Sequence, residues 1–173
     1  NQVTDNLIDG LKRLEYRGYD SSGIAVICDG ALQIEKAGGK IRQLEKKIGD
    51  RVVPGTIGIA HTRWATHGQP ITENAHPHSN GRIAVVHNGI IENFKVLRTE
   101  LEELGYNFVS DTDTEIIPYL LDYFLNQGDE IHLAVRKLLA KIQGAFALGI
   151  IIKDYPARKR RLAYRRLLHA ACR

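Results

Sequence analysis

Methionine is absent from the 173 residues of this sequence, which opens at Asn1 almost directly in a helix-like pattern. Because the chain lacks even an initiator residue, we interpret it as a fragment or processed form whose natural start lies upstream. Cysteine is nearly absent as well. The two cysteines, Cys28 and Cys172, indicate neither a disulfide framework nor a zinc site.

The sequence also lacks a long hydrophobic segment. Its longest apolar run, residues 145–152, is far shorter than the roughly 20 residues that cross a bilayer. No signal-peptide pattern opens the chain. We therefore expect a cytoplasmic protein with no membrane partner.

Acidic residues are missing from residues 157–173, which carry seven Lys and Arg, whereas residues 1–156 carry 17 Lys and Arg against 20 Asp and Glu. The net charge of +4 therefore comes from the tail and says little about the partners of the rest. A basic tail could bind nucleic acid, but Tyr164 is its only aromatic residue. We favour a solvated end and expect no nucleic-acid partner.

Apolar and charged fractions of 43% and 25% are typical of one soluble domain with a sizeable core. Helical spacing of apolar residues predicts a first helix over 3–14, and Asp29-Gly30 predicts a tight turn between two strands. The pattern then predicts strands over 23–28, 31–34, 56–60, 82–86 and 144–152, and helices over 41–48, 93–105, 113–125 and 131–142. The last strand is expected to be buried on both faces. This order of elements indicates an α+β fold with helices packed against sheets.

Residues 61–70, which read HTRWATHGQP, place a guanidinium, an indole, hydroxyls and imidazoles on what we expect to be one loop. The planar fork of Arg63 can bind a carboxylate with two parallel hydrogen bonds. The same residue could equally form a surface ion pair.

Asn88-Gly89 follows a predicted apolar strand. A side-chain amide and an unhindered backbone N–H that point to the same position can stabilise the oxyanion of an acyl-transfer intermediate. Asn-Gly is also a favoured turn dipeptide, so a plain turn is the alternative.

Asp113 lies in the acidic and hydroxyl-rich run SDTDTE, residues 110–115. A carboxylate there could hold an ammonium group. The run could also cap the following helix, since acids are favoured at a helix N-terminus.

Residues 61–70 and Asn88-Gly89 together predict a pocket for a small zwitterion beside an oxyanion hole, but no residue stands out as its nucleophile. Cys28 ends an apolar strand, where a free cysteine is usually a small hydrophobic residue, and Cys172 lies in the tail. Five of the seven histidines fall within residues 61–87, but their spacing matches no familiar ligand pattern, so we predict no metal.

Five motifs nevertheless occur in a definite order. They are LEYRGYDSSG (14–23), HTRWATHGQP (61–70), NAHPH (74–78), HNGIIEN (87–93) and SDTDTE (110–115). Over about residues 3–156 the chain closely resembles the glutaminase domain of the glutamine–fructose-6-phosphate aminotransferases, also called glucosamine-6-phosphate synthases. Amidophosphoribosyltransferases are similar in outline but lack the Trp-Ala-Thr-His form of the second motif.

The resemblance implies a class II glutamine amidotransferase with the N-terminal-nucleophile fold, a four-layer α/β/β/α sandwich of two antiparallel sheets, here incomplete. In that family an N-terminal cysteine attacks the carboxamide of glutamine, and its own α-amine is the general base. An α-amine and a thiol titrate close together, so this proton exchange is easy. The ammonia passes to sugar-isomerase domains, which convert fructose 6-phosphate to glucosamine 6-phosphate. The family uses no metal or cofactor here, and the parent protein is expected to be a homo-oligomer.

By position, the resemblance implies that Arg63 binds the α-carboxylate of glutamine and Asp113 its α-ammonium. Asn88 and Gly89 would form the oxyanion hole, with Gly89 also contacting the substrate.

Three further roles follow from the resemblance. Thr66 and His67 would belong to the loop that closes over glutamine, and Trp64 would gate the ammonia path. Arg17 would position the N-terminal strand with its cysteine.

The chain departs from this family at both ends. Residues 1–156 are expected to be a partial glutaminase domain without its nucleophile strand. Residues 157–173 form an atypical basic tail, for which a reading-frame shift is our hypothesis. As given, the chain is expected to be inactive. A non-catalytic module that binds glutamine or glutamate is the alternative.

Overall fold

The computed structural model describes residues 3–49, 55–64, 69 and 71–155 of the chain, and the side chain of Arg17 lies outside this description. The helices are α1 (Val3–Lys12), α2 (Ile41–Ile48), α3 (Phe94–Glu103), α4 (Ile116–Asn126) and α5 (Ile131–Lys141), with a short 3₁₀ turn at Glu15–Arg17. The strands are β1 (Ser21–Cys28), β2 (Ala31–Gly38), β3 (Ile57–Arg63), β4 (His78–Ser79), β5 (Ile83–Gly89) and β6 (Phe146–Ile152).

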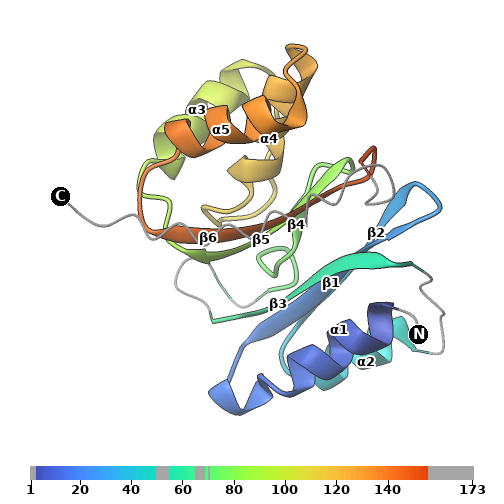
Figure 1. The fold of residues 1–173 in the computed structure, drawn as a ribbon. Coiled ribbons are helices and arrows are strands. Elements are labelled where there is room, and N and C mark those ends of the chain that lie inside the picture. The colour runs from blue at the N-terminus through green and yellow to red at the C-terminus, as the bar shows by residue number, and fades with distance from the viewer. Residues whose placement is uncertain (1–2, 50–54, 65–68, 70, 156–173) are drawn as a thin grey trace.

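The elements form four layers, as Figure 1 shows. Two antiparallel sheets, with strand orders β2-β1-β3 and β4-β5-β6, lie face to face. Helices α1 and α2 cover the outer face of the first sheet, and α3, α4 and α5 cover the outer face of the second. This α/β/β/α order confirms the predicted fold class.

Strand β1 lies at the centre of the first sheet, and all eight of its residues are buried. Side chains alternate across a strand. Ile24 and Val26 therefore pack with α1 and α2, whereas Ala25 and Ile27 pack against β5 and β6 of the other sheet. Burial of each such large aliphatic side chain contributes about 1.5–3 kcal/mol, so β1 links the two hydrophobic layers.

The hairpin between β1 and β2 has the predicted two-residue turn. Asp29 and Gly30 both have positive φ, at 49° and 77°, which is the backbone of a type I′ turn. Cys28 pairs with Ala31, and the register runs back to Ser21 beside Gly38. The turn therefore fixes which strand ends lie together at the far end of the sheet.

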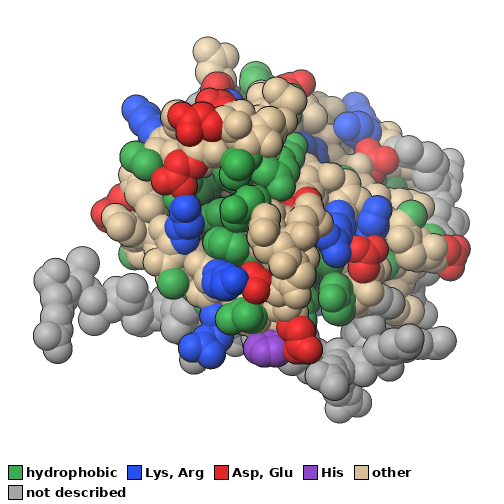
Figure 2. All heavy atoms as spheres, turned by 90° about the horizontal axis from the view of Figure 1, so that it is seen from above, with side chains coloured by type: hydrophobic (Ala, Val, Ile, Leu, Met, Phe, Trp, Pro, Cys, Tyr) green, Lys and Arg blue, Asp and Glu red, His purple; other side chains and the backbone are tan. Residues whose placement is uncertain are grey.

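The outer surface of α3–α5 carries charges of both signs. Figure 2 shows Lys and Arg side chains interspersed with Asp and Glu around a group of hydrophobic side chains on this face. Ion pairs such as Lys137–Asp129 and Lys141–Glu100 contribute to this mixture. A mixed surface does not create the single-sign field that attracts nucleic acid. Within the described ranges, no helix has the length and apolar character needed to span a bilayer.

Two strand predictions need correction. Strand β3 continues to Arg63, so His61, Thr62 and Arg63 lie on a strand and not on the expected loop. Strand β6 is fully buried only at Ile151 and Ile152, because it lies at the edge of its sheet and has one strand neighbour in the described part.

Candidate functional site

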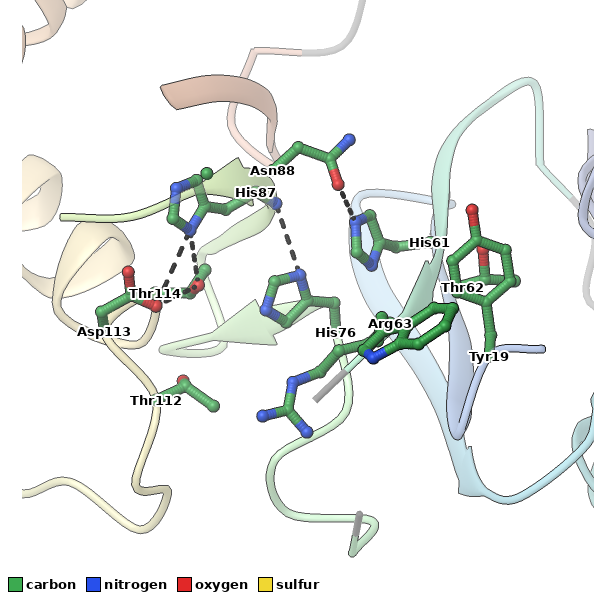
Figure 3. Close-up of a pocket in the computed structure, with 12 residues that line it drawn as sticks. Tyr19, His61, Thr62, Arg63, His76, His87, Asn88, Thr112, Asp113 and Thr114 are labelled. Carbon is green, nitrogen blue, oxygen red and sulfur yellow. Dashed lines mark hydrogen bonds and ion pairs between the residues drawn. The ribbon is translucent and has the colours of Figure 1, made fainter. Parts of the chain in front are cut away.

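A pocket of about 220 Å³ opens at one end of the sandwich, between the two sheets (Figure 3). This volume corresponds to roughly seven waters at about 30 Å³ each, and so suits a small metabolite. The pocket is lined by Tyr19, His61, Thr62, Arg63, Trp64, His76, His87, Asn88, Gly89, Thr112, Asp113 and Thr114.

The strand register explains why these residues meet. Ser21, which begins β1, pairs with Arg63, which ends β3. In the second sheet, β5 ends at Gly89, and its last residues face the same end of the sandwich. The loop that carries His76 fits directly against β1, because Gly23 has no Cβ to collide with the carbonyl oxygen of His76.

Arg63 is buried, with 5% of its surface exposed, so the surface ion-pair alternative is wrong. Burial lowers the pKa of its guanidinium, while the carboxylates of Asp20 and Asp113 act in the opposite direction. A buried guanidinium in a polar pocket gains free energy when a ligand brings a further carboxylate that binds its fork.

Asp113 is also buried, at 7% exposure, and its carboxylate is held firmly. Oδ2 accepts a 2.8 Å hydrogen bond from the backbone N–H of Ile91, and Oδ1 accepts one of 3.3 Å from the Thr114 hydroxyl. A carboxylate has about four lone-pair sites, so acceptor capacity remains for a ligand. The run also caps α4, as the alternative held, but through Glu115, which is the N-cap residue of that helix, and not through Asp113.

The Glu115 side chain instead stabilises the preceding loop. Its two carboxylate oxygens accept hydrogen bonds from the backbone N–H groups of Ser110, at 2.7 Å, and Val109, at 3.1 Å. Glu115 is 3% exposed. The loop that presents Asp113 is therefore fixed from within.

Asn88 and Gly89 are the last two residues of β5, paired with Ala147 and Phe146, so the turn alternative is wrong. Both are exposed to the pocket. Gly89 has φ 121°, and a Cβ there would collide with the carbonyl oxygen of Ala145. Only glycine fits this backbone position.

Four histidines form a group at the pocket, and three of them, His61, His76 and His87, line its wall. The ring centroid of His76 lies 4.5 Å from that of His61, 5.0 Å from that of His78 and 6.4 Å from that of His87. Burial is the main cause that lowers the pKa of each ring. The group is therefore neutral at physiological pH. In the described ranges, no set of three or more His, Cys, Asp or Glu is arranged to hold a metal ion.

Sequence reasoning missed His61, His76 and His87 as residues of the pocket wall. One signal could have found His61, because it lies two residues before Arg63 and so shares its face of β3. His76 and His87 carried no such signal, since only tertiary packing brings their segments to β3.

Two loops around the pocket are tied together by Asn74, which is fully buried. Its Nδ2 donates to the carbonyl oxygen of Gln69, and its Oδ1 accepts from the backbone N–H of Asp111, both at 3.0 Å. Lys36 of β2 donates a 3.0 Å hydrogen bond to the carbonyl oxygen of Glu73, and burial lowers the pKa of Lys36 to about 8.

The remaining predicted site residues are placed only in part. Trp64 lines the pocket with 64% of its surface exposed. Thr66, His67 and the side chain of Arg17 lie outside the described residues.

Cys28 is not near the pocket. It lies at the opposite end of β1 from Ser21, seven residues or roughly 23 Å away. Burial and the neighbouring Asp29 raise the pKa of its thiol, which disfavours the nucleophilic thiolate. Cys172 lies outside the described residues.

A family model described as "Glutamine amidotransferase domain" matches residues 59–166. Among curated proteins, the chain is 54% identical over 154 residues to glutamine–fructose-6-phosphate aminotransferase [isomerizing] of Zymomonas mobilis. The match covers 89% of this chain and 25% of that protein. The enzyme of the same name from Caldanaerobacter subterraneus is 53% identical over 157 residues, with 90% and 26% covered. The chain thus spans about a quarter of the length of these relatives.

Solved structures agree with the fold. Glutamine phosphoribosylpyrophosphate amidotransferase from B. subtilis superimposes with a TM-score of 0.69 at 29% identity, covering 84% of this chain and 32% of that one. A glutamine aminotransferase class-II domain protein from Silicibacter pomeroyi, at 16% identity and a TM-score of 0.54, shares the fold, with 76% and 65% covered.

These matches confirm the resemblance that the five sequence motifs indicate. With more than half of its residues matched by one family model and with curated relatives above 50% identity, the chain belongs to the glutamine amidotransferase domain family.

Proposed function

We propose that this chain binds L-glutamine in the pocket and forms the glutamine-hydrolysing site of a class II amidotransferase. One observation carries the proposal: a buried guanidinium and a buried carboxylate, Arg63 and Asp113, share a 220 Å³ pocket with Asn88 and Gly89. The α-carboxylate and α-ammonium of free glutamine complement the charges of Arg63 and Asp113. Its side-chain amide can be contacted by Asn88 and Gly89.

Binding depends on the charged pair. The fork of Arg63 binds the α-carboxylate with two parallel hydrogen bonds. The α-ammonium donates to the free lone pairs of Asp113. Thr66 and His67 belong to the loop that closes over the bound amino acid, and Trp64 gates the path by which ammonia leaves.

The chemistry is acyl transfer. A thiolate adds to the amide carbon of glutamine, and Nδ2 of Asn88 and the N–H of Gly89 stabilise the oxyanion that forms. The C–N bond then breaks, the nitrogen takes a proton and leaves as ammonia, and water hydrolyses the thioester to glutamate. The thiolate is the N-terminal cysteine of the family, positioned by Arg17, and its α-amine takes the thiol proton.

The name of these relatives, glutamine–fructose-6-phosphate aminotransferase, extends the proposal to the whole protein. The ammonia passes to sugar-isomerase domains, where fructose 6-phosphate becomes glucosamine 6-phosphate. We expect that protein to be cytoplasmic and homo-oligomeric.

The binding role of Arg63 is tested in the natural full-length polypeptide that carries these residues. Arg63→Gln removes a charge-assisted interaction worth about 1.5–3 kcal/mol, so KM for glutamine should rise about 10- to 100-fold. Arg136→Gln, on the exposed face of α5, is the matched control and should leave KM unchanged. Glutamate release measures both, and an unchanged KM in Arg63→Gln would contradict the proposal.

A polypeptide limited to these 173 residues should release no glutamate, because it carries no cysteine at its first position. Adding a short N-terminal segment that begins with cysteine should restore release. A rate in the shorter polypeptide equal to that of the longer one would show that another residue is the nucleophile.

One observation favours a second candidate, a non-catalytic glutamine- or glutamate-binding module. Arg63 and Asp113, which would hold the charged groups of an amino acid, both line the pocket, and binding by them needs no nucleophile. Isothermal titration distinguishes the candidates. Binding without glutamate release by the natural full-length polypeptide would support the module, and release would exclude it.

A further inference from the structure

We propose that His61 is a positioning residue that sets the orientation of the Asn88 side-chain amide. This inference rests on the oxyanion-hole role proposed above. His61 is on β3 of the first sheet and Asn88 is on β5 of the second, so one hydrogen bond across the sheets would align the reaction machinery.

The contact is direct. Nε2 of His61 lies 2.9 Å from Oδ1 of Asn88, as the dashed line in Figure 3 shows. An amide side chain rotates about a soft sp³–sp² bond with two nearly equivalent orientations. Backbone pairing in β5 fixes where Asn88 starts but not which end of its amide faces the pocket. A polar neighbour therefore determines whether the oxygen or the nitrogen of the Asn88 amide faces the pocket.

His61 can hold the amide oxygen of Asn88 only if its Nε2 carries the proton and donates it. A neutral imidazole has one N–H, and burial together with nearby Arg63 lowers the pKa of this ring. Nδ1 of His61 is buried and has no hydrogen-bond partner among the described residues. A proton there would leave a buried donor unsatisfied, so the Nε2–H form is favoured.

The ring itself is held in place by its neighbour. The His76 ring lies 4.5 Å from His61 between centroids, tilted by 35°. Nδ1 of His76 in turn accepts a 3.4 Å hydrogen bond from the backbone N–H of His87, the residue before Asn88. The support for His61 is thus tied to the strand that carries its hydrogen-bond partner.

The consequence is chemical. With Oδ1 occupied by His61, Nδ2 of Asn88 is the end left to donate to a developing oxyanion. In the flipped orientation the oxygen would face that negative charge and repel it. His61 would therefore act on the transition state and not on the bound substrate.

The test uses the natural full-length polypeptide and glutamate release. His61→Phe keeps a flat ring against His76 but cannot donate. Loss of one oxyanion-hole donor costs about 10²–10³ in kcat, so loss of its orientation should lower kcat about 10- to 100-fold. KM for glutamine should change less than about twofold, because ground-state binding is untouched. His132→Phe, on the exposed side of α5, is the matched control.

Two comparisons separate positioning from a general structural effect. His61→Gln can donate to Oδ1 and should recover part of kcat. In the His61→Phe background, Asn88→Ala should cost several-fold less than in the wild type, since coupled residues are not additive. Additive losses, or an unchanged kcat in His61→Phe, would overturn the inference.

A direct readout does not depend on activity. Nitrogen-15 NMR of the His61 ring in the wild-type protein should show the Nε2–H tautomer, and the Nδ1–H tautomer would overturn the inference. This readout also decides the case in which His61→Phe does not fold. Failure of the proposed function has a different signature, namely a wild-type protein that releases no glutamate at all.

Discussion

At the residue scale, opposite charges and unusual backbone positions meet in a space of about 220 Å³. Arg63 and Asp113 are buried, yet they come from segments 50 positions apart. Burial of ionic groups is costly unless they are paired or hydrogen-bonded. Asp113 meets this condition through hydrogen bonds from the Ile91 N–H and the Thr114 hydroxyl.

Gly89 is the residue at which we expect the sharpest effect on stability. Gly89→Ala adds a Cβ at φ 121° and pushes it into the carbonyl oxygen of Ala145, so the free energy of unfolding should fall by more than about 3 kcal/mol. Gly128→Ala, also at positive φ but with open space around it, is the matched control and should cost about 1–2 kcal/mol. Urea unfolding measures both. Equal losses would mean that the collision with Ala145 is relieved at little cost.

At the scale of elements, the pocket depends on loops that are tied both to each other and to the sheets. Asn74 connects the segment around Gln69 with the loop that presents Asp113. Lys36 fixes the same segment from β2 through the carbonyl oxygen of Glu73. These contacts keep the loops around the pocket in register with the ends of β3 and β5.

Asn74→Ala should therefore weaken glutamine binding without removing any group from the pocket. It removes two part-buried hydrogen bonds, to the Asp111 N–H and the Gln69 carbonyl oxygen, at about 1–3 kcal/mol of stability, and KM for glutamine should rise roughly 3- to 10-fold. Asn107→Ala, an exposed change in the same part of the chain, should change neither quantity. Steady-state glutamate release and thermal unfolding are the measurements. An unaffected KM with lowered stability would limit Asn74 to a structural role.

At the scale of the whole molecule, the two sheets enclose four neutral histidines at the end of the sandwich that holds the pocket. His61, His76, His78 and His87 have pKa values lowered mainly by burial. In the unfolded chain they titrate near 6.5. Below that pH the unfolded state binds protons that the folded state does not, so stability falls as the pH is lowered.

We therefore expect the free energy of unfolding, measured with urea, to decrease as the pH is lowered from about 7 to about 5.5. Each histidine contributes up to about 1.4 kcal/mol per pH unit to this slope. His76→Gln should reduce this slope by about one histidine's share, since it removes one proton site from the unfolded chain. Asn107→Ala, which changes an exposed residue that does not titrate, is the control and should leave the slope as it is. A slope identical in the wild type and in His76→Gln would show that His76 is not neutral in the folded state.

Much of the fold could be predicted from the chain because the signals are local. The Asp29-Gly30 turn, the helical spacing in α1 and α2, and the strongly apolar β1 depend on residues close in sequence. The end of β3 could not be predicted, because its polar residues from His61 to Arg63 are strand only by pairing with β1. The burial of Arg63 could not be predicted for the same reason, because it too follows from the pairing of β3 with β1.

The sequence by itself determined the layered α+β fold and the residue types of the pocket, through local periodicity and the order of five motifs. Only the tertiary structure decided that His61 contacts Asn88, that Asp113 is anchored to Ile91 and that Cys28 lies at the far end of its strand. The physical reason is that these relations join separate sheets and loops. Hydrogen bonds and burial between distant segments exist only once the two sheets have packed together.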